Sequence, residues 1–272
     1  MSTPELLHIS SRDNAWFKDL KRLAYGNTDY RKQGRIWAEG DHLVRAALGR
    51  GVQPAMGVFA ASYWPLAAAA YTGAAAKNIV ISDDLFDAVS TLESPARMGF
   101  VFDLAPPPAL QPGVASVILD RVQDAGNVGS ILRSASAFGF KQIIALKGTA
   151  ALWSPKVLRA GMGAHWGLQL IEGSELDQIA TLSVPLLVTS SHRGSYLHQA
   201  LMNQALPWPC AWALGHEGQG VCTELEARAS GHVRIAQPGG EESLNVAAAA
   251  AICLHASAAV YLAQAPRVVP RL

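Results

Sequence analysis

The sequence predicts an α/β protein made of two domains, and three observations support this class. Half of its 272 residues are hydrophobic, which is enough for a sizeable core. Short apolar runs alternate with helix-like segments along most of the chain, as in proteins built around a mostly parallel sheet. A proline-rich stretch, residues 105–113, interrupts this alternation and is typical of an extended linker. The expected domains are therefore residues 1–104 and 114–272.

The first domain is expected to be the smaller of the two. Trp16, Leu20 and Leu23 recur at helical spacing, which predicts a helix that buries one side. A strand, a turn at Gly40 and a helix are expected within residues 35–50. The remaining elements expected here are a strand over 58–60, a helix over 65–76, a strand over 79–82, a helix over 83–90 and a strand over 99–104.

Basic side chains concentrate between residues 10 and 50, where aromatic residues are interleaved with them. Basic and aromatic side chains together can bind phosphates and stack on bases, which makes this segment a candidate for RNA contact. A solvated helix face is the alternative, and the pattern alone leaves both open. The candidate RNA-binding residues are Arg12, Lys18, Lys21, Arg22, Arg31, Lys32 and Arg35.

The second domain is expected to hold a parallel sheet, because its apolar runs are short and helix-like segments separate most of them. The expected order is a strand over 115–119, a loop and helix over 121–140, a strand over 142–146, a short helix over 156–163, a strand over 167–171, a helix over 174–181, strands over 185–190, 209–214 and 232–235, and a terminal helix over 244–264.

The net charge and the cysteine content limit which partners and which cellular compartment are expected. The chain has 22 Lys and Arg against 21 Asp and Glu, so a nucleic-acid partner must be met by local patches. Cys210, Cys222 and Cys253 form no CxxC pair and leave one cysteine unpaired, so reduced thiols and a cytoplasmic location are expected. The first residues lack a basic segment followed by an apolar one, so no secretion or membrane signal is expected.

Three glycine-bearing loops follow predicted strands, at residues 120–133, 215–221 and 237–245. Ligands of parallel α/β sheets bind at the carboxyl ends of strands, so these loops are a candidate site. Neither a GxGxxG nor a GxxxxGK[ST] motif occurs, which argues against a nicotinamide enzyme or an ordinary NTPase. No GxSxG motif supports a hydrolase around Ser191 and His192.

No metal site is expected. His216, Glu217, Glu241 and Glu242 lie near these loops, but their spacing matches no ligand motif such as HExxH. Hydrogen bonding within turns is the stronger interpretation of these side chains.

The stretch of residues 235–256 joins a strand, a glycine-rich bend and an alanine-rich helix. Gly239 and Gly240 allow the bend, and Ser243 and Asn245 stand where a helix begins. A helix cap and a ligand pocket are both consistent with this pattern, because free N–H groups at a helix start can bind either a cap or a ligand.

The three loops together resemble the SPOUT class of RNA methyltransferases, and in particular its SpoU/TrmH family of ribose 2′-O-methyltransferases. Departures from the family pattern are Ala125 in place of proline, His216 in place of asparagine, and Ala236 and Gln237 in place of Pro-Met. The first motif comprises Asp124, Gly126, Asn127, Val128, Gly129 and Arg133, the second Leu214, Gly215, Glu217, Gly218 and Gly220, and the third Ile235, Gly239, Glu242, Ser243, Leu244, Asn245 and Val246.

The resemblance implies a parallel-sheet domain with a trefoil knot that binds S-adenosylmethionine as methyl donor. It also implies a homodimer formed through this domain. The catalytic residues it implies are Arg133, Asn127, Glu217, Ser243 and Asn245, with Arg133 also contacting RNA as either a base or a phosphate clamp. The cofactor-binding residues it implies are Leu214, Gly215, Glu217, Gly218, Gly220, Ile235, Gln237, Leu244 and Asn245.

Residues 11–23 and 30–48 are similar to the amino-terminal substrate-binding domain of many members of this family, whose fold resembles small kink-turn-binding ribosomal proteins. This domain favours ribosomal RNA as the substrate over tRNA. A tRNA 2′-O-methyltransferase and a noncatalytic RNA-binding or ribosome-assembly protein are the alternatives.

Overall fold

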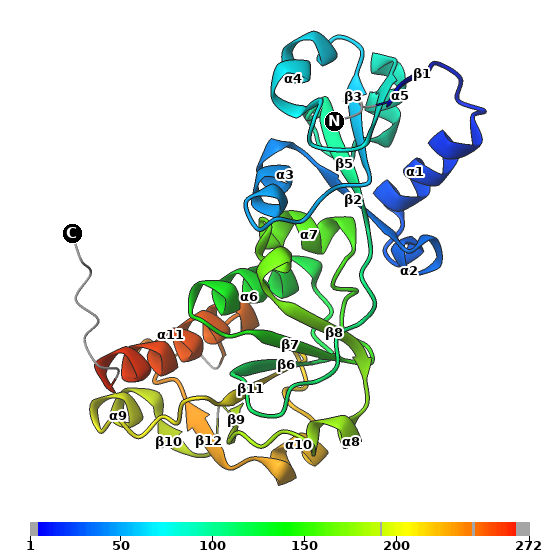
Figure 1. Cartoon of the computed structure of the whole chain (residues 1–272). Coiled ribbons are helices and arrows are strands. Elements are labelled where there is room, and N and C mark those ends of the chain that lie inside the picture. The colour runs from blue at the N-terminus through cyan, green and yellow to red at the C-terminus, as the bar shows by residue number, and fades with distance from the viewer. Residues whose placement is uncertain (1–4, 191, 241–242, 265–272) are drawn as a thin grey trace, which may run out of the picture. The chain divides into compact units, whose positions relative to one another are not determined.

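A computed structural model describes residues 5–190, 192–240 and 243–264 (Figure 1). The chain divides into two compact units. The first comprises Met1–Pro106 and Ala151–Gly167, and the second comprises Pro107–Ala150 and Leu168–Leu272. Each unit is an α/β structure with its own sheet, so the expected fold class is confirmed.

The sheet of the first unit has five strands in the order β1-β4-β3-β5-β2. The β1, β4 and β3 strands are parallel, whereas β5 runs antiparallel to β3 and β2. Helices cover this sheet and bury aromatic side chains such as Phe59, Phe86 and Phe100. The elements are β1 (Glu5–Ile9), α1 (Ala15–Tyr25), α2 (Asp29–Gln33), β2 (Arg35–Glu39), α3 (Asp41–Leu48), β3 (Met56–Ala60), α4 (Trp64–Tyr71), β4 (Lys77–Ile81), α5 (Asp83–Val89) and β5 (Met98–Asp103).

A segment from the middle of the chain completes the first unit. It holds α7 (Pro155–Gly161) and the short 3₁₀ helix η1 (Ala164–Gly167). Leu158 is part of the core of this unit, and the Trp166 ring lies 4.7 Å from that of Phe102. The domain boundaries expected from the sequence, 1–104, 105–113 and 114–272, remain a prediction.

The sheet of the second unit has seven strands in the order β10-β12-β9-β11-β6-β7-β8, and all its neighbouring pairs are parallel. Its central strands are buried runs such as residues 116–120, as a sheet covered on both faces requires. The elements are β6 (Ser116–Asp120), α6 (Ala125–Ala137), β7 (Gln142–Leu146), β8 (Gln169–Ser174), α8 (Leu176–Ile179), β9 (Leu186–Thr189), β10 (Ser195–Tyr196), α9 (Leu197–Met202), β11 (Ala211–Gly215), α10 (Thr223–Arg228), β12 (Gly231–Arg234) and α11 (Val246–Gln264).

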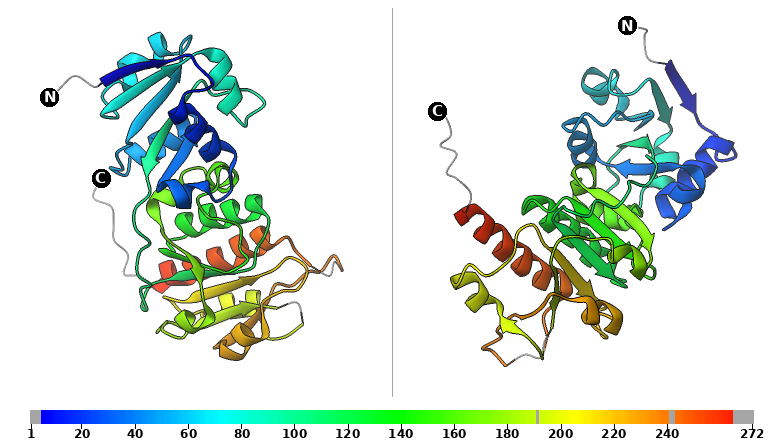
Figure 2. Two further views of the ribbon diagram at one scale, coloured as in Figure 1. Left: turned by 90° about the vertical axis from the view of Figure 1, so that its right-hand side faces the viewer. Right: turned by 60° about the horizontal axis from the view of Figure 1, so that its bottom comes forward.

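Helices form a layer on each face of this second sheet (Figures 1 and 2). On one face Ile118 belongs to a cluster that includes Ile179 of α8 and Leu225 of α10. On the other face α11 packs against α6 and β11, and the indole Nε1 of Trp212 donates a 3.0 Å hydrogen bond to Ser257. Successive residues of a strand point to opposite faces of the sheet, so the same strands supply side chains to both helix layers.

Among the described residues, α11 is the one helix long and apolar enough to cross a membrane by length and composition. The core helix of a globular protein passes the same test, and α11 buries Cys253, Leu254 and Val260 within the second unit. Its other side remains exposed and carries Tyr261 and Leu262.

Several expected elements differ from those observed. The helix expected over 65–76 ends at Tyr71, since the Thr72 hydroxyl hydrogen-bonds the carbonyl of Ala68 and Gly73 follows. The sequence analysis missed β1, an edge strand whose side chains are mostly exposed. It also missed five short elements, namely α2, η1, β10, α9 and α10.

Candidate functional site

The carboxyl ends of four neighbouring parallel strands, β12, β9, β11 and β6, meet at one edge of the second sheet. A cavity of about 830 Å³ opens there, which we call the strand-end cavity. Its volume is in the range of small-molecule sites. It is lined by Thr189, Ser190, His192, Tyr196, His216, Glu217, Gly218, Gln219, Gly220, Val221, Glu226, Arg234, Ile235, Ala236, Gln237 and Ser243.

One wall of the strand-end cavity is a tight loop after β11, the 216–220 loop. Backbone hydrogen bonds in both directions join His216 to Gly220, and Nδ1 of His216 accepts the N–H groups of Gly218 and Gln219 at 3.0 and 3.2 Å. A Cβ atom on Gly215 would lie 2.1 Å from the carbonyl carbon of Gly220. Glycine is therefore required at position 215 for the loop to close this tightly.

A chain of side-chain hydrogen bonds links the three motifs. Nδ2 of Asn127 donates to Oε1 of Glu217 at 3.1 Å, and Nδ2 of Asn245 donates to Oδ1 of Asn127 at 2.9 Å. Both hydrogen-bonding ends of the Asn127 amide are therefore used. The fold brings together residues that lie 90 and 118 positions apart in the sequence.

Glu217 is held as a carboxylate. Its oxygens also accept the backbone N–H groups of Gln123 and Asp124, at 3.5 and 3.4 Å. Partial burial raises the pKa of Glu217, but the hydrogen bonds from Asn127 and from these backbone groups outweigh it and lower the pKa overall. The carboxylate is therefore charged at neutral pH and joins the 216–220 loop to the start of α6.

Capping residues start both helices at this site, and one of them, Asn245, is also a member of the hydrogen-bond chain. Oδ1 of Asp124 accepts the N–H of Asn127 at 2.7 Å and starts α6. Oδ1 of Asn245 accepts the N–H groups of Ala247 and Ala248, at 2.9 and 3.2 Å. Asn245 thus both caps α11 and bonds to Asn127, so the helix cap expected for this stretch is observed, while a ligand pocket there stays a prediction.

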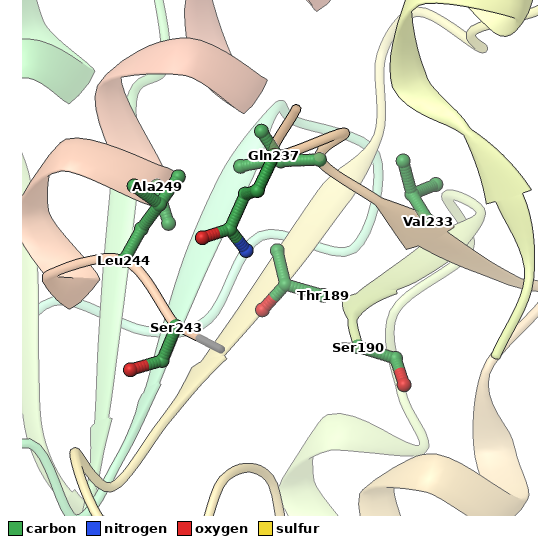
Figure 3. Close-up of a pocket in the computed structure, with 8 residues that line it drawn as sticks. Thr189, Ser190, Val233, Gln237, Ser243, Leu244 and Ala249 are labelled. Atoms are coloured by element: carbon green, nitrogen blue, oxygen red, sulfur yellow. The ribbon is translucent and has the colours of Figure 1, made fainter. Parts of the chain in front are cut away.

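A smaller pocket of about 140 Å³ adjoins the strand-end cavity and shares several of its residues (Figure 3). The Gln237 amide points between Thr189 and Ser243 (Figure 3). Its buried Oε1 has no hydrogen-bond partner among the residues that the structure describes. Because a buried unpaired polar atom is costly, this one is available to a ligand.

The predicted site residues fall into three groups. Glu217, Gly218, Gly220, Ile235, Gln237, Ser243 and Leu244 line the strand-end cavity or the smaller pocket, whereas Leu214 and Gly215 lie at the end of β11. Asn127 and Asn245 join them through the hydrogen-bond chain. Arg133 is exposed on α6, about 9 Å along the helix axis from Asn127, and is not among the lining residues. Glu242 of the third motif, like Glu241 and Ser191, lies outside the described residues.

The basic residues predicted to bind RNA lie in the first unit, on and around α1 and α2. Ion pairs with acidic neighbours include Lys18 with Asp13, Arg22 with Asp19, and Arg35 with Asp103, at 2.9–3.0 Å, and Nε of Arg31 donates to the Tyr30 hydroxyl at 3.1 Å. Arg12, Lys21, Arg31 and Lys32 are exposed. The basic segment therefore presents less free charge than its composition indicated.

Sequence reasoning missed cavity residues on the β9 and β12 side, notably Thr189, Ser190, Tyr196 and Arg234. Thr189 and Ser190 could have been predicted from the sequence, because they end a predicted strand of the same parallel sheet. Tyr196 and Arg234 form a pair in which the guanidinium lies 4.2 Å from the ring centre. Such pairing across β10 and β12 could not be read from spacing alone.

Two of the departures from the family pattern have clear local roles. Ala125 is the first residue of α6, a position that proline also suits. His216 closes the 216–220 loop through its Nδ1, as an asparagine oxygen can do in an Asx turn. No cluster of His, Cys, Asp or Glu suited to a metal ion occurs among the described residues.

Comparison with known proteins identifies related chains. Residues 115–255 match the SpoU rRNA Methylase family. The 23S rRNA (guanosine(2553)-2′-O)-methyltransferase RlmP of Bacillus subtilis is 28% identical over 250 residues, which cover 91% of this chain and 97% of that protein. The human mitochondrial rRNA methyltransferase 3 is 30% identical over 191 residues, which cover 66% of this chain and 46% of that protein.

Solved structures share the fold over nearly the whole chain. An S-adenosylmethionine-bound rRNA methyltransferase from Sinorhizobium meliloti aligns with a TM-score of 0.78 and 25% identity, covering 93% of this chain and 97% of that one. A TrmH-family RNA methyltransferase described as putative, from Porphyromonas gingivalis, aligns with a TM-score of 0.77 and 29% identity, covering 91% and 98%.

Proposed function

Because the chain belongs to the SpoU rRNA methylase family, we propose that it transfers a methyl group from S-adenosylmethionine to a ribose 2′-hydroxyl of RNA. The observation that carries this proposal is the Glu217–Asn127–Asn245 chain beside the strand-end cavity, since it unites all three family motifs. An intact polar site of this kind also favours an enzyme over a noncatalytic RNA-binding protein.

The strand-end cavity and the smaller pocket suit this cofactor. The unpaired Oε1 of Gln237 can accept from a ligand. Among the described residues, none beyond the immediate chain neighbours has an atom within 4 Å of where a Cβ would stand on Gly220 or Gly239. These features leave space for a ligand against the backbone of two loops. When bound there, S-adenosylmethionine supplies an electrophilic methyl group. Leu214, Gly215, Gly218, Ile235 and Leu244 would contribute backbone and apolar contacts.

The residues of the chain orient the reacting groups. Glu217 holds the 216–220 loop against the start of α6 through its hydrogen bond with Asn127. Asn127 also accepts a hydrogen bond from Asn245, which fixes the start of α11 relative to α6. Ser243 lines both pockets beside Gln237 and has an exposed hydroxyl that can bind a substrate or cofactor oxygen. Transfer between bound groups gains from such fixed geometry.

Arg133 is proposed to bind the phosphate next to the target ribose. A guanidinium keeps its charge at neutral pH and bonds phosphate with two donors. Arg133 is exposed on α6 and does not line the cavity of its own chain, which leads us to propose that it acts in the site of a second subunit.

A homodimer through the second unit would bring Arg133 to such a site. Apolar side chains are exposed on α9 and α11, where a solvated surface would favour polar ones: Leu201, Met202, Ile252, Tyr261 and Leu262. A cavity of about 510 Å³, lined mostly by apolar side chains, lies beside them. A two-fold dimer would bury this surface against its own copy.

Mixing two inactive variants tests the shared site. Arg133→Ala removes the phosphate clamp, and Asn245→Ala damages the cavity side. If the two act in one site from different subunits, an equimolar mixture regains up to about one quarter of wild-type activity, because about half of its dimers are mixed and each mixed dimer has one intact site of two. Mixtures that remain as inactive as either variant alone would contradict the shared site.

Ribosomal RNA is the proposed substrate class, with tRNA as the alternative. Support comes from the rRNA methyltransferase RlmP, whose similarity extends over 91% of the chain and so includes the first unit. Exposed Arg12, Lys21 and Lys32 of that unit are proposed to contact RNA phosphates. A trefoil knot in the second unit and a cytoplasmic location complete the proposal.

The function is tested by incubating purified protein with methyl-labelled S-adenosylmethionine and either ribosomal RNA or tRNA. We expect incorporation into ribosomal RNA, little into tRNA, and loss of incorporation with Arg133→Ala. Wild-type incorporation by the Arg133 variant would remove its assigned role, and transfer to tRNA alone would reverse the substrate proposal.

A further inference from the structure

Arg121, between β6 and α6, has a backbone conformation that is rare for a residue with a side chain. Its φ is 59°, in the left-handed region that glycine favours. The Thr149 hydroxyl holds this conformation, because it accepts the N–H of Arg121 at 3.1 Å and donates to the carbonyl of Leu119 at 2.9 Å. Strained conformations of this kind persist where surrounding contacts fix them, and they are concentrated at functional sites.

The guanidinium of Arg121 is fixed by a buried carboxylate. Nε and Nη2 donate to the two oxygens of Asp120, at 2.8 and 3.2 Å, and Asp120 is 2% exposed. This hydrogen-bonded pairing raises the pKa of Arg121. Oδ2 of Asp120 also accepts the N–H of Cys222 at 2.6 Å, so the same carboxylate anchors the chain just before α10.

The remaining arm of the guanidinium reaches the 216–220 loop. Nη1 of Arg121 donates to Oε1 of Gln219 at 3.0 Å. Glu217 attaches the same loop to the start of α6. The loop is thus held at two points, with the exposed Gly218 between them on the wall of the strand-end cavity.

We propose that Arg121 is a positioning residue that keeps the 216–220 loop in the conformation that receives the cofactor, acting through Gln219. This inference rests on the proposed function, because the ligand it concerns is S-adenosylmethionine. Arg121 does not line the strand-end cavity, so it acts through the loop. An exposed, glycine-rich loop without this contact must be ordered by the ligand itself, which reduces affinity.

Arg121→Gly tests the proposal, because glycine adopts the same backbone conformation without strain while the guanidinium is lost. The thermal midpoint should fall, because the buried Asp120 loses its cationic partner, and relief of the backbone strain offsets only part of that loss. The calorimetric Kd for S-adenosylmethionine should rise about fivefold, as expected for loss of one exposed charge-assisted hydrogen bond. The KM for this cofactor should rise by a similar factor, while kcat at saturation stays unchanged.

Gln219→Ala removes the other end of the same contact and leaves the Asp120–Arg121 pair in place. It should raise the Kd for S-adenosylmethionine to a similar extent. The Kd of the double variant should be no higher than that of either single variant, because both substitutions remove the same contact. Lys147→Ala is the matched control, since Lys147 is an exposed cation after β7 that pairs with Glu175 and not with the loop. Its Kd should equal that of the wild type.

The outcomes separate this inference from the proposed function. If the wild type binds S-adenosylmethionine and both Arg121→Gly and Gln219→Ala bind it equally well, the positioning role is wrong and the proposed function stands. If the two losses of affinity for S-adenosylmethionine add up in the double variant, the proposal that Arg121 acts through Gln219 is also wrong. If the wild type binds no S-adenosylmethionine, the proposed function itself fails. Should Arg121→Gly not fold, Gln219→Glu decides the question beside Gln219→Ala, because glutamate keeps a side chain of the same length on the cavity wall and an acceptor for Arg121. Its Kd should stay near that of the wild type, and a Kd raised as much as in Gln219→Ala would overturn the positioning role.

Discussion

The most informative single substitution is Asn127→Ala, because Asn127 is the middle of the chain that links the three motifs. It removes the donor to Glu217 at 3.1 Å and the acceptor for Asn245 at 2.9 Å. The helix itself should persist, since alanine suits helix interiors and the Asp124 cap uses the backbone N–H of residue 127. The free energy of unfolding should fall by no more than about 2 kcal/mol, since the same two hydrogen bonds are lost from the folded protein.

The expected loss of activity follows from the two hydrogen bonds. The bond to the Glu217 carboxylate is worth about 1.5 kcal/mol, and the neutral bond from Asn245 about 0.5 kcal/mol, since both lie in a partly exposed site. Their sum of about 2 kcal/mol corresponds to about a thirtyfold decrease in kcat/KM. Asn127→Asp should lose more, because it keeps the acceptor for Asn245 but places a second carboxylate beside Glu217.

The assay is methyl transfer from labelled S-adenosylmethionine at several cofactor and RNA concentrations, with Ser130→Ala as the control. Ser130 is exposed on the same helix, one turn further on, so its variant should match the wild type. Activity of Asn127→Ala within twofold of wild type, with unchanged KM for both substrates, would refute the role of the hydrogen-bond chain.

Three further predictions concern stability and assembly. Gly215→Ala should lower the free energy of unfolding by about 2 kcal/mol or more in urea titrations, because its Cβ would lie 2.1 Å from the carbonyl carbon of Gly220. Gly239→Ala is the control and should change that free energy little, since no described residue beyond its chain neighbours lies within 4 Å of the added Cβ. Burial lowers the pKa of His165 to about 4, and the hydrogen bond from its Nε2 to the carbonyl of Leu152 opposes this only in part, so the folded form binds a proton less readily than the unfolded form. Stability should therefore be full above about pH 6.5 and fall by up to about 3 kcal/mol as pH decreases toward 4, and unfolding curves of equal stability at pH 7 and 5 would contradict this. Leu262→Glu, at a 71% exposed position on α11, should convert the proposed dimer into monomers in sedimentation experiments, and an unchanged mass would argue against that interface.

Much of the second sheet could be predicted because its strands are buried on both faces. Runs such as residues 142–146 are almost wholly apolar and lie between helix-like segments, so their identity does not depend on tertiary context. The two-residue β10 and the exposed edge strand β1 carry no such signal. Residues 151–167 could not be assigned to the first unit, because packing against Phe102 is a tertiary property.

The candidate site was predictable as a set of loops but not as a set of contacts. Parallel strands place their following loops at one edge, which explains why the three motif loops lie close together. The pairing of Asn127 with Glu217 and Asn245 depends on strand order, with β11 inserted between β9 and β6. The contact between Arg121 and Gln219 depends in addition on a left-handed backbone at an arginine, which no spacing rule indicates.

The central claim is that this chain methylates the ribose of RNA. The direct measurement is nucleoside mass spectrometry of ribosomal RNA after reaction with the purified protein and S-adenosylmethionine carrying a heavy methyl group. Ribose methylation predicts a labelled nucleoside whose added mass stays with the sugar fragment. Label on a base, or no labelled nucleoside under conditions in which the protein binds both S-adenosylmethionine and RNA, would contradict the claim.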